Sequence, residues 1–344
     1  MKHYLQKYIA HSYYSFYGKI MKQLKAYSLL FWLLFLTKCK SLSVLSENKQ
    51  KVCLSGNAVL GTEINLVKLE DNTNSYSASA ETSKGALVAN GVVVIRNQSM
   101  DRPAQCNFTQ NLGTMIVLPK SLQDKDPEPG LRAIQRVTNY FHNGTWKGAG
   151  HCFGCYWHKD GNFHSADYIA SVLYAGKVLG PAKATIFLDN CAAYDLIPSE
   201  LKSRIKDTIF WVSVRDIPDF KNGTKEDFAL FPDAALHPIF YTHPGSGRRC
   251  LYMTNTMVTL RPRSVDEMKD LQKAWDIMIT QSPKYHHYWT SGDIVIWDNL
   301  AVMHKAGEKR LGYSPRDPRM LFRTQYHISK TTRENILDYV IAKS

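Results

Sequence analysis

Residues able to bind a metal ion lie close together in the segment YWHKDG, from Tyr156 to Gly161. In an extended strand, alternate residues point to the same face. His158 and Asp160 are therefore predicted to present an imidazole nitrogen and a carboxylate oxygen to one ion. Gly161 would then let the chain turn away. On its own the pair is weak evidence, because His-x-Asp occurs by chance in many chains and in surface turns.

A third ligand has to come from another part of the chain, and His304 has the most distinctive surroundings of the 12 histidines. It follows GDIVIWDN (292–299), a predicted buried strand that ends in a polar turn. With His158 and Asp160 it would complete a 2-His-1-carboxylate facial triad, the ligand set of non-haem Fe(II) oxygenases. Arg319 lies further along, and a guanidinium can bind a carboxylate through two parallel hydrogen bonds.

These residues, in this order, resemble the motifs of the TauD/TfdA-like (taurine dioxygenase) family of Fe(II)- and 2-oxoglutarate-dependent oxygenases. The family has a W-H-x-D core, a later threonine, W-D-N-x(4)-H and a terminal R-x(3)-R. Here the matching residues are Trp157 to Asp160, Thr185, Trp297 to Asn299 with His304, and Arg319 with Arg323. The similarity continues in GVVVIRNQ (91–98), AAYDLIPSELKSRI (192–205) and HPIFYTHPGSGRRCLYM (237–253), and it runs from about residue 54 to 328.

The resemblance implies a mixed α+β fold dominated by β-structure, with a double-stranded β-helix (jelly-roll) core and flanking helices. It implies that His158, Asp160 and His304 bind Fe(II). Thr185 and Arg319 would bind the distal carboxylate of 2-oxoglutarate, and dioxygen would be the other cosubstrate. The expected reaction oxidises an unactivated C–H bond of a small anionic or zwitterionic metabolite and releases succinate and CO2.

Three further residues are candidates for substrate binding: Arg323, Asn139 and His164. Arg323 shares a strand face with Arg319, and the matching arginine of the family's sulfonate user contacts the anionic group of the substrate. The segment at 140–156 differs from the corresponding taurine-site segment, which argues against taurine itself. Asp160 stands where halogenating relatives have a small residue, which argues against halogenation.

Several alternatives remain at this point. A zinc hydrolase would not need the two residues assigned to 2-oxoglutarate, and a catalytically silent metal-binding protein would be expected to have lost a ligand. Desaturation or oxidative ring closure would be other outcomes of the same iron chemistry. A betaine-type (trimethylammonium) hydroxylase would need an aromatic cage. Four aromatic residues could supply that cage: Tyr156, Trp157, Trp211 and Tyr288.

Hydrophobic patterning predicts the elements that position these residues. Short strands are predicted at 60–66, 91–96, 169–174, 183–188, 292–299 and 319–328. Helical patterns are predicted at 199–213 and 265–279, a loop followed by a helix at 75–87, a charged loop at 119–130 and a hairpin turn at 245–249. Many short strands without a βαβ alternation predict a β-barrel or jelly roll with helices outside. Without G-x-G-x-x-G, P-loop or G-x-S-x-G motifs, the commonest dinucleotide, nucleotide and hydrolase classes are excluded.

The first 46 residues are predicted to form a leader, separate from an oxygenase domain at 47–344. Within it, the apolar run at 27–37 is flanked by lysines and is shorter than the ~20 residues that cross a bilayer as a helix. It fits a targeting sequence for the secretory pathway or an organelle, or a membrane-associating segment; the alternative is a helix of the fold in a cytoplasmic protein. The N-glycosylation tripeptides at Asn97, Asn107, Asn143 and Asn222 do not establish secretion.

Charge and cysteine content narrow the partners. The whole chain has 43 basic residues and a net charge of +13. Seven of the basic residues are lysines of the leader, so the rest of the chain has 36 basic and 30 acidic residues. A mildly basic body suits a small anionic substrate, and nucleic-acid-binding motifs are lacking from the sequence, so no nucleic-acid partner is expected. Seven scattered cysteines predict no disulfide framework. Two cysteines, Cys152 and Cys155, are too few to form a zinc site, so they are expected to be ordinary thiols or to form a local redox bridge. The sequence does not indicate an oligomeric state.

Overall fold

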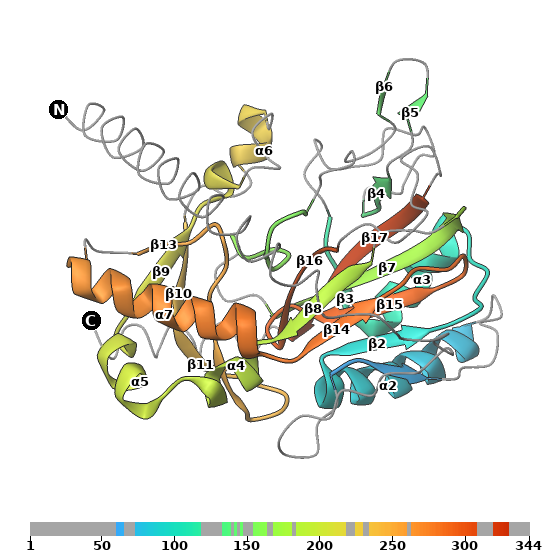
Figure 1. The fold of residues 1–344 in the computed structure, drawn as a ribbon. Helices are drawn as coiled ribbons and strands as arrows, with labels where there is room; N and C mark the ends of the chain where they lie inside the picture. Colours follow the sequence, from blue (N-terminus) through green and yellow to red (C-terminus); the bar gives the residue numbers. More distant parts are fainter. Residues whose placement is uncertain are drawn as a thin grey trace, which may run out of the picture. The chain divides into compact units, whose positions relative to one another are not determined.

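A seven-stranded mixed sheet forms the centre of the domain (Figure 1). The computed structural model describes residues 60–64, 73–117, 133–138, 141–142, 145–146, 154–163, 168–180, 184–217, 224–229, 234–259, 263–307 and 319–329. The strands lie in the order β1 (Thr62–Ile64), β2 (Val92–Ile95), β15 (Ile294–Asp298), β7 (Tyr168–Val178), β17 (Arg319–Ser329) and β3 (Thr114–Met115), with β4 (Gln135–Thr138) beside β17. The fold is mixed α/β and rich in β-structure.

A second, antiparallel sheet faces the first. Its three strands lie in the order β14 (Lys284–His287), β8 (Thr185–Asp189) and β16 (Val302–Ala306). Phe187 and Val302 of this sheet pack with Val94, Val295 and Trp297 of the larger one in a single buried cluster. Successive side chains of a strand point to opposite faces, so one face of β2 meets the smaller sheet while the other meets helices.

Helices α2 (Thr73–Asn90) and α3 (Arg102–Leu112) cover the outer face of the larger sheet (Figure 1). Tyr76 of α2 and Phe108 of α3 lie in one buried cluster with Val93 and Ile95 of β2. The sequence analysis did not predict α3. Its start has a recognisable signal, because Asp101 caps the helix by accepting a hydrogen bond from the backbone N–H of Ala104, at 2.8 Å.

A second group of helices packs on small β-elements beside the smaller sheet. The helices are α4 (Asn190–Leu196), α5 (Ser199–Ile205), α6 (Lys225–Ala229) and α7 (Val265–Gln281). The small β-elements are the sheet β10 (Ala235–Pro238), β9 (Ile209–Val212) and β13 (Val258–Thr259), and the hairpin β11 (Phe240–Thr242) and β12 (Arg249–Leu251). A further two-stranded pair, β5 (Phe141–His142) and β6 (Thr145–Trp146), lies away from these helices (Figure 1). A capping box between Ser264 and Glu267 begins α7.

Most predicted elements are confirmed. The six predicted strands contain or overlap β1, β2, β7, β8, β15 and β17, the hairpin turn joins β11 to β12, and α7 covers the predicted helix at 265–279. The predicted loop at the start of 75–87 is wrong, because α2 is continuous from Thr73. The charged loop at 119–130, the leader with its apolar run, and Cys152 lie outside the described residues.

The prediction of one helix at 199–213 is wrong in its second half. Helix α5 ends at Ile205, and Ile209–Val212 is strand β9. In β9, Phe210 and Val212 are buried, and Ile209 and Trp211, which alternate with them, are half-buried. This alternation is the two-residue period of a strand. Pairing with β10 and β13 on either side therefore decides the conformation over the local helical spacing.

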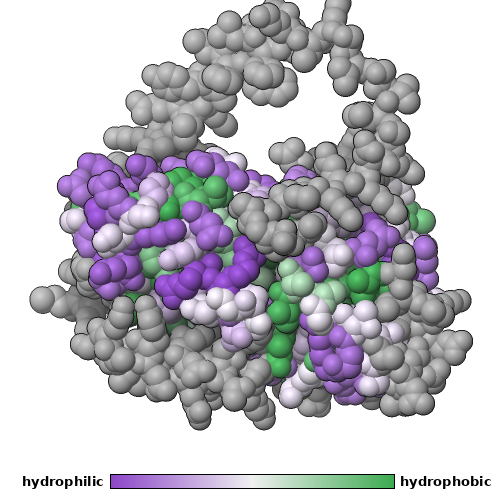
Figure 2. All heavy atoms as spheres, turned by 90° about the horizontal axis from the view of Figure 1, so that it is seen from below, coloured by the Kyte–Doolittle hydropathy of each residue, from purple (hydrophilic) through white to green (hydrophobic). Residues whose placement is uncertain are grey.

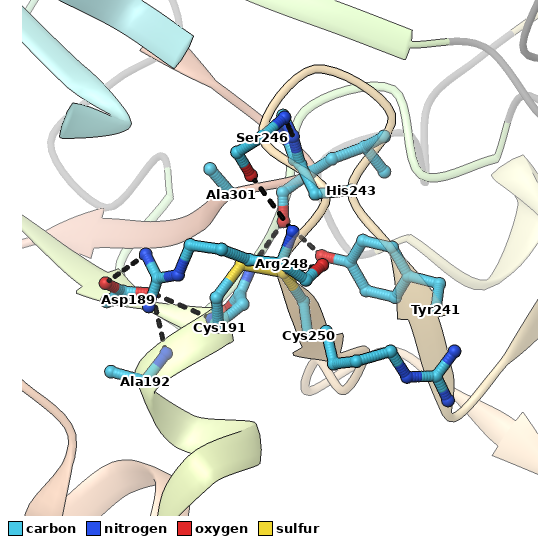
Figure 3. The surroundings of a disulfide bond; sticks show 12 residues. Asp189, Cys191, Ala192, Tyr241, His243, Ser246, Arg248, Cys250 and Ala301 are labelled. Carbon is cyan, nitrogen blue, oxygen red and sulfur yellow. Dashed lines mark hydrogen bonds and ion pairs between the residues drawn. A yellow bond between two sulfur atoms is a disulfide. The ribbon is translucent and has the colours of Figure 1, made fainter. Parts of the chain in front are cut away.

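A disulfide bond joins Cys191 of α4 to Cys250 of β12, which are 59 positions apart in the chain (Figure 3). Spacing does not predict this pair, because the two half-cystines meet only through the packing of α4 on β12. Nearby, Arg248 forms an ion pair with Asp189 at 3.3 Å, and Asp189 caps α4 by accepting from the backbone N–H groups of Cys191 and Ala192. The disulfide bond therefore links the segment that follows β8 to the β11–β12 hairpin.

Apolar side chains on the described surface are scattered among hydrophilic ones, as one face shows (Figure 2). The large hydrophobic residues that are exposed come from several segments, and among them only Val265 and Met268 share one, helix α7: Val117, Leu179, Leu196, Val265, Met268 and Tyr288. Such single residues are ordinary on folded proteins and mark no docking surface. Among the described helices, none combines the length and apolar character needed to cross a membrane.

A buried ionic network closes the turn between β14 and β15. The carboxylate of Asp293 accepts hydrogen bonds from the Thr290 backbone N–H at 2.8 Å and from Arg96 at 2.7 Å, and pairs with His287 Nε2 at 3.1 Å. Burial alone would raise the pKa of Asp293, but the bonds from His287 and Thr290 and the charge of Arg96 lower it below its usual value. The network fixes residues 288–293 against β2.

Asp293→Asn should reduce the free energy of unfolding by roughly 2–4 kcal/mol at pH 7, because it breaks a buried charge network. A lowered carboxyl pKa stabilises the fold above the unfolded-state value, near 4, and this contribution is lost as the pH falls through the folded-state pKa. Urea unfolding between pH 7 and pH 3 measures both effects, and the variant should lack this part of the acid sensitivity. Asp276→Asn, on the exposed face of α7, is the matched control. Equal stability of Asp293→Asn and wild type at pH 7 would contradict the prediction.

Candidate metal centre

His158 and His304 face each other across an isolated antiparallel bridge. The backbone N–H of His158 donates to the carbonyl of His304 at 3.0 Å, and the reverse bond is 2.9 Å. The imidazole ring centroids are 4.2 Å apart. The prediction that the His-x-Asp segment is a strand is wrong beyond this single bridge, because Asp160 already begins a turn. Gly161 follows with a φ of +67°, a conformation that favours glycine, so the predicted change of direction is confirmed.

Asp160 completes a cluster of three potential ligands. One ligand atom from each of His158, Asp160 and His304 lies within 4.8 Å of the others. Asp160 Oδ1 is 4.0 Å from Nε2 of His158 and 3.9 Å from Nε2 of His304. Two ligands that each bind an ion at about 2.1 Å are at most about 4.2 Å apart, so these atoms are close enough to share one ion.

The Asp160 carboxylate is held as an anion by its neighbours. Oδ1 pairs with Arg323 at 2.5 Å, and Oδ2 accepts a hydrogen bond from the Ser171 hydroxyl at 2.6 Å. Burial opposes ionisation, but the charge of Arg323, the two histidines and the Ser171 bond outweigh it and lower the pKa of Asp160 to about 2. The group is therefore a carboxylate throughout the physiological pH range.

The two imidazoles turn their Nε2 atoms toward this carboxylate. Nδ1 of His158 lies 2.8 Å from the Tyr156 carbonyl, which can only accept, so Nδ1 donates this hydrogen bond and Nε2 is the nitrogen left to bind an ion. Burial and the neighbouring charges of His158 and Arg323 lower the pKa of His304 well below its usual value. His304 is therefore neutral at pH 7, as a metal-binding imidazole must be.

The Trp297-Asp298-Asn299 motif positions both halves of the cluster. Asn299 Oδ1 accepts from the backbone N–H of Asp160 and from the indole of Trp297, each at 3.0 Å, while its Nδ2 donates to Ser171 at 3.1 Å. Asp298 Oδ1 accepts from the backbone N–H groups of the next turn, at Leu300 and Ala301, which leads into β16 and His304. The motif was identified in the sequence by resemblance, and these hydrogen bonds explain how it holds the segments that carry Asp160 and His304.

Gly154 and Lys159 support the centre from either side. A Cβ atom on Gly154 would lie 2.9 Å from Cε1 of His158, and its φ is +66°, so this position requires glycine. Lys159 is buried with its ammonium 3.2 Å from the carbonyl of Leu300 and 4.2 Å from the ring centre of Tyr252. It therefore ties the His-x-Asp segment to the turn before β16. Sequence spacing did not single out either residue.

A pocket opens beside the cluster. His158 and His304 form part of its wall, together with Thr185 of β8 and with Arg319 and Arg323 of β17. The two arginines and Leu321 between them alternate along β17, so all three side chains share one face. The apolar wall consists of Val137, Leu173, Leu321 and Trp297.

Five of the eight predicted site residues thus line one cavity, and a sixth, Asp160, lies in the ligand cluster beside it. Arg323 differs from its prediction in one respect, since it pairs with Asp160 as well as lining the pocket. Asn139 and His164 lie outside the described residues. Ser171, which bonds Asp160 from β7, was not predicted, because a serine within an apolar strand run has no distinctive spacing.

Two imidazoles and one carboxylate beside an otherwise open cavity are the arrangement of mononuclear non-haem iron oxygenases. Residues 54–325 match the model of the taurine catabolism dioxygenase TauD, TfdA family. The chain belongs to this family.

Named relatives agree with this assignment, and a solved structure shares the fold. An alpha-ketoglutarate-dependent sulfate ester dioxygenase of Pseudomonas putida is 26% identical over 269 residues, covering 72% of this chain and 81% of the relative. An (S)-phenoxypropionate/alpha-ketoglutarate-dioxygenase of Sphingobium herbicidovorans is 25% identical, with 72% and 86% covered. The crystal structure of AAD-2 in complex with Mn(II) and N-oxalylglycine superposes with a TM-score of 0.61 at 22% identity, covering 79% of this chain and 97% of that one.

Proposed function

We propose that this protein is an Fe(II)- and 2-oxoglutarate-dependent dioxygenase that oxidises an unactivated C–H bond of a small anionic or zwitterionic metabolite. One observation carries the proposal. Ligand atoms of His158, Asp160 and His304 lie within 4.8 Å of one another, and the two histidines line a pocket together with Thr185 and Arg319. A zinc hydrolase would have no use for the last two residues, and a silent binding protein would not need to keep all three ligands.

The residues fit a divalent iron ion. Two imidazoles and an ionised carboxylate supply two nitrogen donors and one oxygen donor, and the orientation of His158 is set by the Tyr156 carbonyl as expected for metal-binding histidines. Arg319 and Thr185 would hold the distal carboxylate of 2-oxoglutarate, through a guanidinium fork and a hydroxyl. When bound, iron, 2-oxoglutarate and dioxygen supply the oxidation and release succinate and CO2.

The chain's own contribution is to orient and to exclude. Leu173, Leu321 and Trp297 line the pocket with apolar surface, which limits water next to the reacting C–H bond. Ser171 and Asn299 keep Asp160 in place, so the oxidising centre and the substrate are held in a fixed relation. A double-stranded β-helix is the architecture that we infer for the two facing sheets, within an oxygenase domain at 47–344 preceded by a leader at 1–46.

The named relatives favour an anionic substrate, because by their names they act on sulfate esters and on phenoxypropionate. Arg323 lines the pocket as well as pairing with Asp160, and so places positive charge where a substrate anion would lie. The betaine-type alternative has less support: Tyr156, Trp157, Trp211 and Tyr288 are absent from the wall of the described pocket. Lys305 also stacks over the Trp157 ring, with its Nζ 4.9 Å from the ring centre.

A succinate-release screen tests the function. Purified protein with Fe(II), 2-oxoglutarate and dioxygen should release succinate faster with one class among sulfate esters, sulfonates, aryloxy acids and betaines. Mass spectrometry of the product then separates hydroxylation from desaturation and ring closure, since the first adds one oxygen and the others remove two hydrogens. Stimulation by betaines alone would contradict the anionic substrate class. No release of succinate with any compound, from protein that binds iron, would contradict the dioxygenase assignment.

Ser171→Ala should weaken Fe(II) or Mn(II) binding by roughly tenfold, because a residue that hydrogen-bonds to a metal ligand commonly contributes this much to metal affinity. Without the Ser171 bond, the Asp160 carboxylate loses one of the contacts that orient it. Competition with a chromophoric chelator measures the metal dissociation constant. Ser291→Ala removes a hydroxyl that binds the Val178 backbone at an exposed edge and is the matched control. Equal metal affinity of the two variants would show that Ser171 does not position Asp160.

A further inference from the structure

Trp289 lies in the turn between β14 and β15, behind Thr185 of the pocket wall. Its indole Nε1 donates a hydrogen bond to the hydroxyl of Thr185 at 3.0 Å. Both side chains are buried, with 2% of Trp289 and 8% of Thr185 exposed. The contact joins a residue outside the family motifs to one of the two residues assigned to 2-oxoglutarate.

The direction of this bond follows from the chemistry of the two groups. An indole N–H can only donate, whereas a hydroxyl both accepts and donates. The oxygen of Thr185 must therefore be the acceptor, and its own hydrogen is left for another partner. Thr185 and Arg319 both line the pocket, where a bound carboxylate would accept that hydrogen.

We propose that Trp289 is a positioning residue that orients the Thr185 hydroxyl as a hydrogen-bond donor to the distal carboxylate of 2-oxoglutarate. The inference rests on the proposed function. Accepting a hydrogen bond also polarises the hydroxyl, so its bond to a carboxylate becomes stronger. Arg319 then supplies the charge, and the pair Trp289–Thr185 supplies a donor of fixed direction.

The indole is itself held in place. His287 pairs with Thr185 in the β14–β8 register, so Trp289 follows two residues beyond that pair. The rings of His287 and Trp289 meet edge to face, with centroids 4.4 Å apart. The next residue, Thr290, is bound by the buried Asp293 carboxylate through both its backbone N–H and its hydroxyl, each at 2.8 Å. Trp289 is thus fixed before any ligand enters.

A double-mutant cycle tests the role of Trp289. The full-length protein is loaded with Mn(II), which prevents turnover, and 2-oxoglutarate binding is measured by isothermal titration calorimetry. Trp289→Phe keeps an aromatic ring and removes the N–H, so it should raise the dissociation constant of 2-oxoglutarate roughly three- to tenfold. In a Thr185→Val background, adding Trp289→Phe should not weaken 2-oxoglutarate binding further. In a Thr185→Ser background, which keeps the hydroxyl, adding Trp289→Phe should weaken it again.

Readouts other than 2-oxoglutarate affinity separate positioning from packing. Trp289→Phe should leave the Mn(II) dissociation constant within about twofold of wild type, since Trp289 does not contact the metal ligands. Trp275→Phe, on α7, controls for the loss of an indole elsewhere. An unchanged 2-oxoglutarate affinity in Trp289→Phe, or an equal loss in the Thr185→Val background, would overturn the proposal. Wild-type protein that binds Mn(II) but no 2-oxoglutarate would overturn the proposed function as well.

A measurement on the wild-type ring keeps the test independent of how well Trp289→Phe folds. Among the indole N–H resonances of the 7 tryptophans in the 15N-labelled, Zn(II)-loaded protein, one should move in Thr185→Val and the same one should move when 2-oxoglutarate is added to wild type. If no resonance responds to both changes, Trp289 does not sense the ligand through Thr185.

Discussion

Replacing His304 with alanine should weaken Fe(II) or Mn(II) binding by at least about 100-fold. Losing a residue that only hydrogen-bonds to a metal ligand weakens binding by up to about 100-fold, and losing the ligand itself should cost no less. The imidazole is neutral and buried, its Nε2 lies 3.9 Å from Asp160 Oδ1, and His304 is part of the ligand cluster. Without it, one nitrogen donor remains beside the carboxylate. Equilibrium dialysis against Mn(II), followed by metal analysis, gives the affinity.

His327→Ala, at a half-buried position of β17 outside the pocket, is the control and should bind one metal ion per chain like wild type. Because a large-to-small change at a buried site also removes packing, unfolding temperatures of both variants are compared. A folded His304→Ala protein that retains wild-type metal affinity would contradict the assignment of the third ligand.

Arg319→Ala should raise the dissociation constant of 2-oxoglutarate by roughly 10- to 100-fold, because hydrogen bonds to a charged group contribute about 1.5–3 kcal/mol. Metal affinity should be unchanged, since Arg319 lies on the pocket wall at the start of β17 and is not in the ligand cluster. Calorimetric titration of 2-oxoglutarate into the Mn(II) form measures the loss.

Arg319→Lys separates charge from geometry. Lysine keeps the positive charge but cannot form the two parallel bonds of a guanidinium, so only part of the affinity should return. Arg323→Ala provides a comparison within the same strand: it should affect metal binding, through the loss of its pair with Asp160, more than 2-oxoglutarate binding. If Arg319→Ala binds 2-oxoglutarate as tightly as wild type, the cosubstrate lies elsewhere in the pocket.

The sequence could predict the residues of the ligand cluster, because each is identified by type and by its neighbours along the chain. His158, Asp160 and His304 were identified from short motifs, and the structure brings them together at the pocket. Strands such as β2 were predictable because a β-branched run is buried on both faces. Helix α7 was predictable from its apolar spacing and its capping box.

What could not be predicted depends on contacts between distant segments. Ser171 and Trp289 matter through partners 11 and 104 positions away, and neither has a local signal. Strand β9 continues a helical spacing pattern, and only its pairing with β10 and β13 makes it extended. Cys191 and Cys250 meet because α4 packs on β12. Arg323 was placed on the correct face by its strand position, but its pair with Asp160 depends on the fold.

Spectroscopy of the iron form tests the central claim most directly. Anaerobic addition of Fe(II) and 2-oxoglutarate to the purified full-length protein should produce a weak visible charge-transfer band that saturates at one iron and one 2-oxoglutarate per chain. The band requires both molecules together, so it should be absent with either alone and absent from His304→Ala. If wild-type protein gives no band, or if His304→Ala gives the same band, then His158, Asp160 and His304 do not form the proposed iron site.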